Sequence, residues 1–166
     1  QIVAIRQRLG LDDPLLVQFG RWGLRVIQGD LGVSIFSSTP VSTLILQRLE
    51  PTLSLAVLTM IFAVSIAVTL GVLAAWKAGR PVDRLLMGFS VLGFSMPTFV
   101  VGYCLIYVFA IELRWLPVQG YRPILDGVGP WFLHLVLPTV TLGLAYVALI
   151  ARMTRASVQE VLEEDY

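Results

Sequence analysis

The 166-residue chain is poor in the residue types on which most catalytic and metal-binding motifs depend. It has one cysteine, Cys104, and one histidine, His134, so it offers neither a disulfide framework nor a Cys/His zinc cluster. Its one lysine, Lys77, lies in a loop without the glycines of a phosphate-binding motif. We therefore expect no metal, no cofactor and no nucleotide hydrolysis on this chain, and we expect Cys104, which lies in an apolar run, to pack.

Charged residues are also scarce, because Asp, Glu, Lys and Arg make up 14% of the chain and hydrophobic residues make up 57%. Soluble domains carry about 25% charged residues, so this composition predicts a membrane protein. The formal net charge of +1 gives no whole-chain electrostatic argument for a nucleic-acid partner.

Three long runs contain no Asp, Glu, Lys or Arg: Thr52–Trp76, Leu85–Ile111 and Gly127–Ala151. A helix needs about 20 apolar residues to cross roughly 30 Å of hydrocarbon, and each run is long enough with room for tilt. The sequence therefore predicts an all-α, polytopic membrane protein with three transmembrane helices within residues 52–152. The lack of acidic and basic side chains inside these runs argues against proton or sodium coupling there.

The distribution of lysine and arginine around these runs predicts their orientation. Five basic residues lie on one side and three on the other: Lys77, Arg80, Arg84, Arg152 and Arg155 against Arg48, Arg114 and Arg122. Residues 77–84 and the C-terminal segment 153–166 are therefore predicted to be cytoplasmic, and residues 1–51 external. Export of residues 1–51 requires an upstream signal or helix, and Gln1 is not an initiator methionine, so we expect the chain to be a piece of a longer protein.

The external segment is predicted to hold two amphipathic helices. Asp13 followed by Pro14 is typical of a helix start, with Asp13 as the N-cap, and Gly29 is a candidate C-cap. Thr39-Pro40 repeats the start signal, and the second apolar stripe ends at Pro51. The stretch GDLGVSIFSSTPV between them is predicted to be a connector with several turns. Helices of this kind lie on the bilayer interface or pack on the rim of the protein, and docking of a partner is the alternative.

Two prolines, Pro97 in SMPTF and Pro138 in VLPTV, fall near the middle of predicted spans and are expected to kink them. Ordinary packing explains them, and a role in lining or gating a passage is the alternative. Ser95, Thr98, Thr139 and Thr141 are placed to bond the carbonyl groups that the prolines leave free. Small residues are expected to let helices approach closely, namely Gly88, Gly93, Gly102, Gly143 and Ala148.

Ser95 and His134 do not form a serine hydrolase motif. The flanks of Ser95 are not G-x-S-x-G, and no nearby acid orients His134. We expect His134 to be a structural residue near the membrane interface.

Several stretches taken in order resemble the permease subunit of bacterial ABC importers of the dipeptide, oligopeptide and nickel group. They are LGLDDPLLVQF, GDLGVSIFSSTPV, RLEPTLSLAVL, SMPTFVVG, WLPVQGY, LPTVTLGL and the closing RMTRASVQEVLEEDY. The resemblance implies the transmembrane domain of a type I ABC importer, of which this chain holds the second, third and fourth of about six helices. It also implies a multi-pass location in the bacterial inner membrane.

The resemblance further implies that RMTRASVQEVLEEDY leads into a cytoplasmic segment that docks on an ATPase subunit. The coupling residues would be Glu160, Val161, Glu164, Asp165 and Tyr166, and the translocation path or gate would include Ser95, Pro97, Thr98, Pro138 and Thr141. The implied partners are a second permease subunit, two ATP-binding subunits, an extracytoplasmic solute-binding protein and the lipid bilayer.

Other functions stay open at this point. A secondary transporter would carry charged residues in helices outside this chain, and an intramembrane enzyme would need an acid or a metal cluster. A structural membrane protein is a third alternative. The resemblance leaves the solute open among dipeptides, oligopeptides, glutathione-like compounds and nickel complexes, with peptides as the first choice.

Overall fold

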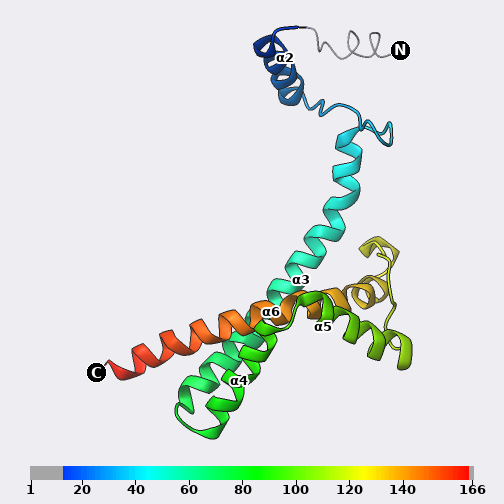
Figure 1. The fold of residues 1–166 in the computed structure, drawn as a ribbon. Coiled ribbons are helices and arrows are strands. Elements are labelled where there is room, and N and C mark those ends of the chain that lie inside the picture. The colour runs from blue at the N-terminus through cyan, green and yellow to red at the C-terminus, as the bar shows by residue number, and fades with distance from the viewer. Residues whose placement is uncertain (1–12, 165–166) are drawn as a thin grey trace. The chain divides into compact units, whose positions relative to one another are not determined.

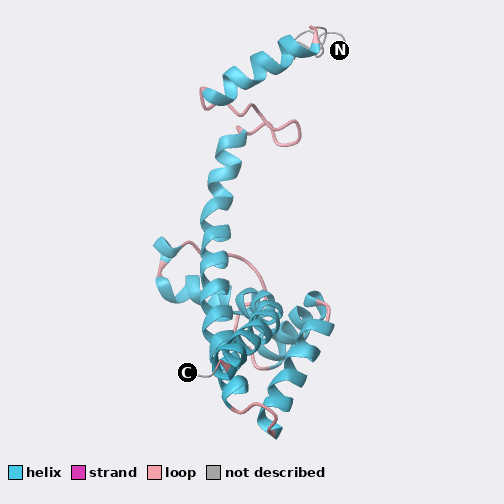
Figure 2. Ribbon diagram, turned by 90° about the vertical axis from the view of Figure 1, so that its left-hand side faces the viewer, coloured by secondary structure: helices cyan, strands magenta, loops and turns pink. Residues whose placement is uncertain are grey.

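The computed structural model describes residues 13–164, apart from the side chain of Phe94, and within that range the chain is helical (Figure 2). Residues 13–164 contain no β-strand, only an isolated bridge between Val33 and Pro40. The all-α prediction is confirmed. The elements are α2 (Leu15–Ile27), α3 (Val41–Trp76), α4 (Pro81–Ser95), α5 (Thr98–Leu105), the π-helix η1 (Ile106–Glu112), the 3-10 turn η2 (Ile124–Asp126) and α6 (Val128–Glu163).

The chain forms two compact units, Gln1–Leu49 and Glu50–Tyr166. In the first unit, α2 begins after Pro14, and Asp13 does not cap it, contrary to the sequence prediction. The Asp13 carboxylate instead pairs with Arg21 across 2.8 Å, and its carbonyl oxygen accepts a hydrogen bond from the Gln18 side chain. These two contacts tie Asp13, two residues before the helix, to the first two turns of α2. Gly29, with φ +84°, follows the end of α2, which fits the turn that closes a helix.

The connector between α2 and α3 folds on itself through its own polar groups. The Asp30 carboxylate accepts the Gly32 N–H at 2.9 Å, which stabilises a tight turn. Backbone bonds from Ser34 to Thr39 and from Val41 to Gly32, both 2.9 Å, then close the loop immediately before α3.

Helix α3 does not end at Pro51, where the sequence analysis ends its second amphipathic stripe; it continues without interruption to Trp76. Proline removes only one backbone bond, to the carbonyl of Gln47, and the long apolar run that follows propagates the helix. The run Thr52–Trp76 is therefore part of a 36-residue helix that starts at Val41.

Helices α3 and α6 pack through small side chains. Ala63 and Ala67 of α3 and Val147 and Ala151 of α6 form a buried cluster, with exposed fractions of 4% or less. Partly buried hydrophobic residues surround this cluster, namely Phe62, Ile66, Leu70 and Ile150. Because alanine leaves room between helix backbones, van der Waals contact between the two helices replaces the lipid contact that each would otherwise have.

Four of the small residues named from the sequence can be compared with this packing. A Cβ atom on Gly143 would meet the Phe62 ring, one on Gly102 would lie 3.2 Å from Thr141, and one on Gly93 would lie 3.8 Å from Ala148. No atom lies within 4 Å of the corresponding position on Gly88. The prediction of close approach therefore applies to Gly143 and Gly102, and not to Gly88.

The run Leu85–Ile111 is divided. Helix α4 ends at Ser95, Met96 is extended (φ −83°, ψ 128°), and α5 begins after Pro97, so that the two helices differ in direction by 98°. The sequence predicted a kink here, and the structure has a complete break instead. The ring of Pro97 disfavours a helical conformation at Met96, which fits the break, although the same effect does not interrupt α3 at Pro51 or α6 at Pro138. Helices α4 and α5 both pack against α6 (Figure 1).

By length and composition, α3 and α6 can each cross a membrane, and a third crossing requires that the bent pair Pro81–Gly93 and Thr98–Glu112 form one span.

The second proline, Pro138, lies inside the continuous helix α6. The neighbouring hydroxyl groups do not bond the carbonyls that the two prolines leave free, which belong to Gly93 and His134. Ser95 donates to the Val91 carbonyl at 2.8 Å, and Thr141 donates to the Leu137 carbonyl at 2.7 Å. Ser95 and Thr141 therefore bond the carbonyl four residues before themselves, which is the arrangement that their own helix provides most directly. The buried Thr139 hydroxyl has no hydrogen-bond partner within the described residues.

Candidate functional site

One turn of α6, Ala151–Arg155, contacts both α3 and α4, and we call this the three-helix junction, with Gly71, Asp83, Ala151, Thr154 and Arg155 as its members. On the α3 side, a Cβ atom added to Gly71 would lie 2.6 Å from the Thr154 Cβ and 2.8 Å from the Ala151 carbonyl oxygen. Only glycine allows this approach. On the α4 side, the contact is a hydrogen-bonded ion pair.

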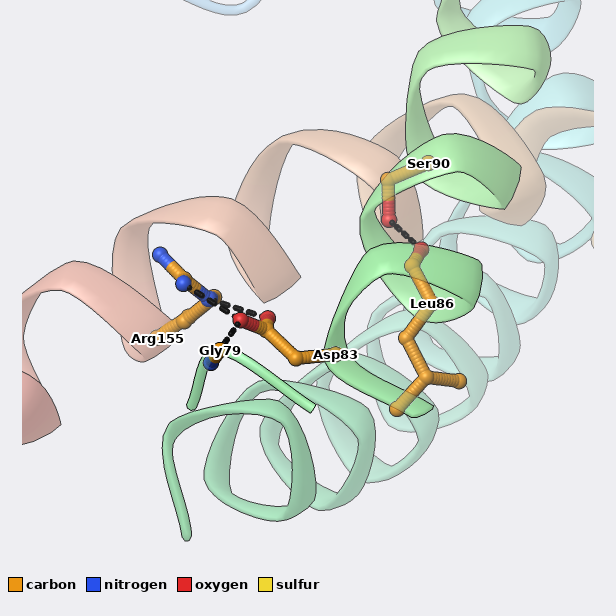
Figure 3. Close-up of polar contacts among 5 residues, drawn as sticks. All are labelled: Gly79, Asp83, Leu86, Ser90 and Arg155. Carbon is orange, nitrogen blue, oxygen red and sulfur yellow. Dashed lines mark hydrogen bonds and ion pairs between the residues drawn. The ribbon is translucent and has the colours of Figure 1, made fainter. Parts of the chain in front are cut away.

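The ion pair joins Asp83, in the first turn of α4, to Arg155 of α6 (Figure 3). The Arg155 Nε donates to Oδ1 at 2.6 Å and its Nη2 donates to Oδ2 at 2.7 Å. This parallel pair of bonds fixes the orientation of the two side chains as well as their separation. The Asp83 side chain is 5% exposed and that of Arg155 is 26% exposed.

The local sequence explains why an aspartate lies at this position. Gly79, with φ +74°, turns the chain after α3, and its N–H donates to the Asp83 Oδ2 at 3.0 Å. Pro81 then starts α4 as its first residue. A carboxylate in the first turn of a helix is favoured by the helix dipole. The turn, the helix start and Arg155 therefore all stabilise the same negative charge.

Asp83 precedes the apolar run that starts at Leu85. The hydrogen bonds from Arg155 lower the pKa of the Asp83 carboxyl group below its ordinary value, and the Gly79 N–H acts in the same direction, while burial opposes both. The net effect is a lowered pKa, so the Asp83 carboxylate is expected to be charged at neutral pH.

A second polar contact joins the opposite end of the α3–α6 pair. The Ser54 hydroxyl of α3 accepts the indole N–H of Trp131 from α6 at 3.2 Å and lies 3.4 Å from the Tyr121 hydroxyl. Close by in the sequence, the Glu50 carboxylate accepts the Ile124 N–H at 2.9 Å. The loop before α6 is thus attached to α3 by side chains that the sequence analysis did not single out.

The five residues predicted for the path or gate fall into two groups. Pro138 and Thr141 of α6 line a cavity of about 380 Å³ together with Gly102, His134 and the loop 117–120. Ser95, Pro97 and Thr98 lie at the break between α4 and α5 and do not line this cavity. The His134 ring bonds the Pro130 carbonyl of its own helix, with 2.7 Å between Nδ1 and the oxygen.

The predicted coupling residues lie at the end of α6. Glu160 and Val161 belong to its last turns, and Glu164 is the residue that follows the helix. Val161 and Leu162 are 55% and 65% exposed, so an apolar surface remains uncovered beside acidic side chains. Asp165 and Tyr166 lie outside the described residues.

Asp83 and Gly71 are the residues that sequence reasoning missed. Asp83 lies between Arg80 and Arg84, in a segment where the positive charges dominate the sequence pattern, and it belongs to the first turn of α4. An acid in the first turn after a helix-starting proline, with an arginine in a later amphipathic stretch, was the available signal. Gly71 continues a spacing of four residues from Ala63 and Ala67, which is a pattern of close helix contact.

The helical fold, the long apolar helices and the scarcity of charge define an integral membrane protein. More specifically, the chain belongs to the family of binding-protein-dependent transport system inner membrane components, whose family model matches residues 67–166. The fold-class prediction and the predicted resemblance are confirmed.

Individual relatives extend this similarity to the whole chain. A probable peptide ABC transporter permease protein, y4tP, from Sinorhizobium fredii is 60% identical over all of this chain and 53% of its own length. The glutathione transport system permease protein GsiC is 44% identical in Salmonella paratyphi A, over 100% of this chain and 52% of the relative. GsiC of Escherichia coli K12 is also 44% identical, over 99% and 51%. The chain therefore spans about half the length of these relatives.

Proposed function

We propose that this chain is part of the membrane-spanning permease subunit of an ATP-driven importer that moves peptides or a related small solute. The family membership carries this proposal. It also favours an ABC permease over a secondary transporter, since the relatives with 60% and 44% identity are named as permeases of ABC or glutathione transport systems. The subunit would lie in the bacterial inner membrane, with residues 77–84 and 153–166 on the cytoplasmic side.

The end of α6 supports a coupling role. Val161 and Leu162 are exposed, and Glu160, Glu163 and Glu164 lie around them. An apolar patch with a charged rim is typical of a helix that docks in a groove on a partner. The partner would be an ATP-binding subunit, with Asp165 and Tyr166 continuing the same contact. ATP hydrolysis would take place on two such subunits and not on this chain.

The break at Pro97 and the cavity beside Pro138 support a path or gate. Helix segments that end within an apolar run expose backbone carbonyl groups, and such backbone is tolerated at membrane depth only where protein or water covers it. Ser95 and Thr98 would lie at one such point, and Thr141 at the cavity wall. A second permease subunit would supply the opposite wall of the path.

The first unit would serve the external side. The apolar residues of α2 include Leu15, Leu16, Phe19, Trp22 and Ile27, all more than half exposed. A helix with this surface lies on the bilayer interface or against another subunit. We propose that residues 1–51 support the outer gate or face an extracytoplasmic solute-binding protein.

Purification of the full-length protein from its native membrane in mild detergent tests the proposal. We expect two ATP-binding subunits and a second permease to accompany it in stoichiometric amounts. A Leu162→Asp variant should lose the ATP-binding subunits because it places a charge in the apolar patch. Leu125→Asp, which places the same charge at a residue that is 93% exposed on the predicted external side, should retain them.

Two outcomes would contradict the proposal. One is a wild-type protein that carries no ATP-binding subunit under conditions that preserve a control ABC complex. The other is equal retention of the ATP-binding subunits by the Leu162 and Leu125 variants, which would remove the coupling role from the end of α6.

A further inference from the structure

The three-helix junction holds one turn of α6 from two directions. Gly71 brings the α3 backbone against Thr154 and the Ala151 carbonyl, and Asp83 holds Arg155 through two short parallel bonds. Contact with α3 prevents α6 from moving toward it, and the fork of hydrogen bonds resists both rotation and sliding relative to α4. This turn of α6 therefore moves together with the start of α4.

The junction lies between the two regions that the proposed function assigns to coupling and gating. Arg155 lies about two helical turns before the end of α6 at Glu163. Asp83 lies in the first turn of α4, and the other end of the same helix is Ser95, next to the break at Pro97. A displacement of the α6 end would therefore reach the break through a single continuous helix.

We propose that Asp83 and Arg155 are positioning residues that transmit movement of the α6 end to α4 and to the break at Met96–Pro97. This inference rests on the proposed function. The pair remains closed throughout the cycle and makes α4 and the end of α6 a single rigid body. Neither residue contacts the solute or the nucleotide in this role.

The chemistry of the pair suits a rigid link better than other charged pairs would. The planar guanidinium group matches both carboxylate oxygens, which a lysine cannot do. Asp83 Oδ2 also accepts the Gly79 N–H, so the carboxylate is attached to the turn that precedes its own helix. Separating the pair would leave a covered, uncompensated charge, which is costly and keeps the link closed.

The test uses the full-length permease in its complex with the ATP-binding subunits, reconstituted in lipid nanodiscs. A spin label on Leu92→Cys, in a Cys104→Ser background, reports on the end of α4, since Leu92 is 64% exposed. Spectra are recorded without nucleotide and with MgATP and vanadate. The critical variant is D83N/R155Q, which removes both charges and so leaves no uncompensated charge. R155K keeps the positive charge but cannot form the two parallel hydrogen bonds. R80Q is the control, because it removes a positive charge from an exposed residue immediately before α4.

In the wild type and in R80Q, we expect MgATP with vanadate to change the spectrum at Leu92. In D83N/R155Q, we expect the complex to assemble and hydrolyse ATP, while the nucleotide-dependent change falls by about fivefold or more; R155K should lie between these limits. A variant that still hydrolyses ATP but loses the spectral change at Leu92 is folded and assembled, so the loss reports on the transmission of movement rather than on stability.

An unchanged response in D83N/R155Q would overturn the inference, and so would the lack of any response at Leu92 in the wild type. Both results leave the proposed function standing, provided that the ATP-binding subunits assemble on the wild-type protein. Lack of those subunits would instead refute the proposed function itself.

Discussion

Replacing Gly71 with alanine would place a methyl group inside the contact between α3 and α6. The new Cβ would lie 2.6 Å from the Thr154 Cβ and 2.8 Å from the Ala151 carbonyl oxygen. Non-bonded carbon atoms prefer separations of about 3.5–4.0 Å, so the two helices would have to separate by roughly 1 Å. The neighbouring cluster around Ala67 and Ala151 would lose close contact as a result.

The expected cost follows from two opposing effects. Overpacking destabilises by about 1–3 kcal/mol, and the upper end applies because one of the obstructing atoms belongs to the backbone and cannot rotate away. Alanine is favoured over glycine inside a helix by about 1 kcal/mol. We therefore expect Gly71→Ala to lower the free energy of unfolding of the full-length protein by about 2 kcal/mol.

Gly88→Ala is the matched control, since it makes the same change inside α4 where no atom lies within 4 Å of the added carbon. Both variants share the gain in helix propensity, so the difference between them isolates the overpacking cost, about 3 kcal/mol. SDS titration of the purified proteins in mixed micelles measures both. Equal stability of the two variants would show that α3 and α6 are not in backbone contact at Gly71.

Four further expectations follow from individual contacts. Gly143→Ala should destabilise the protein in the same titration, because the added methyl group would meet the Phe62 ring. Adding Phe62→Leu should relieve this loss of stability, and the absence of relief would refute the contact between Gly143 and Phe62. Ser54→Ala should cost about 1 kcal/mol by removing the hydroxyl that two partners share, whereas Arg21→Gln should cost less than about 1 kcal/mol because its ion pair is exposed. The folded-state pKa of Asp83 is lowered, so its stabilisation is present above the unfolded pKa and is lost as pH falls toward the folded one. The stability difference between wild type and D83N should therefore be constant near neutral pH and narrow below about pH 4; a difference that persists unchanged in acid would contradict the charged pair.

The helical class was predictable from the sequence, because long runs without charge allow little other than helices in a membrane. Helix ends were not equally predictable. Pro51 and Pro97 present the same local signal, yet α3 continues through the first and the helix breaks at the second. The outcome depends on the helix on both sides of each proline and on its packing, and neither can be read from the proline itself.

The candidate site divides in a similar way. The exposure of apolar side chains beside acidic ones at the end of α6 was predictable because these residues are adjacent in sequence, while their coupling role stays a prediction. The pairing of Asp83 with Arg155 joins residues that are 72 positions apart, and it could not be derived from local patterns. Counting basic residues near the ends of the predicted spans uses Arg155 only to assign orientation, whereas in the folded chain Arg155 also forms an ion pair with Asp83.

The alanine-rich contact of α3 with α6 has a consequence for biosynthesis. Ala67 and Ala151 belong to the same cluster, although 84 residues separate them (151 − 67). At synthesis rates of about 5–20 residues per second, α3 waits roughly 4–17 s before its partner has been made. The side chains of Ala63 and Ala67 tolerate lipid during this interval, since they carry no polar group that needs a partner. Association of α3 with α6 therefore takes place late, inside the bilayer, between helices that are already formed.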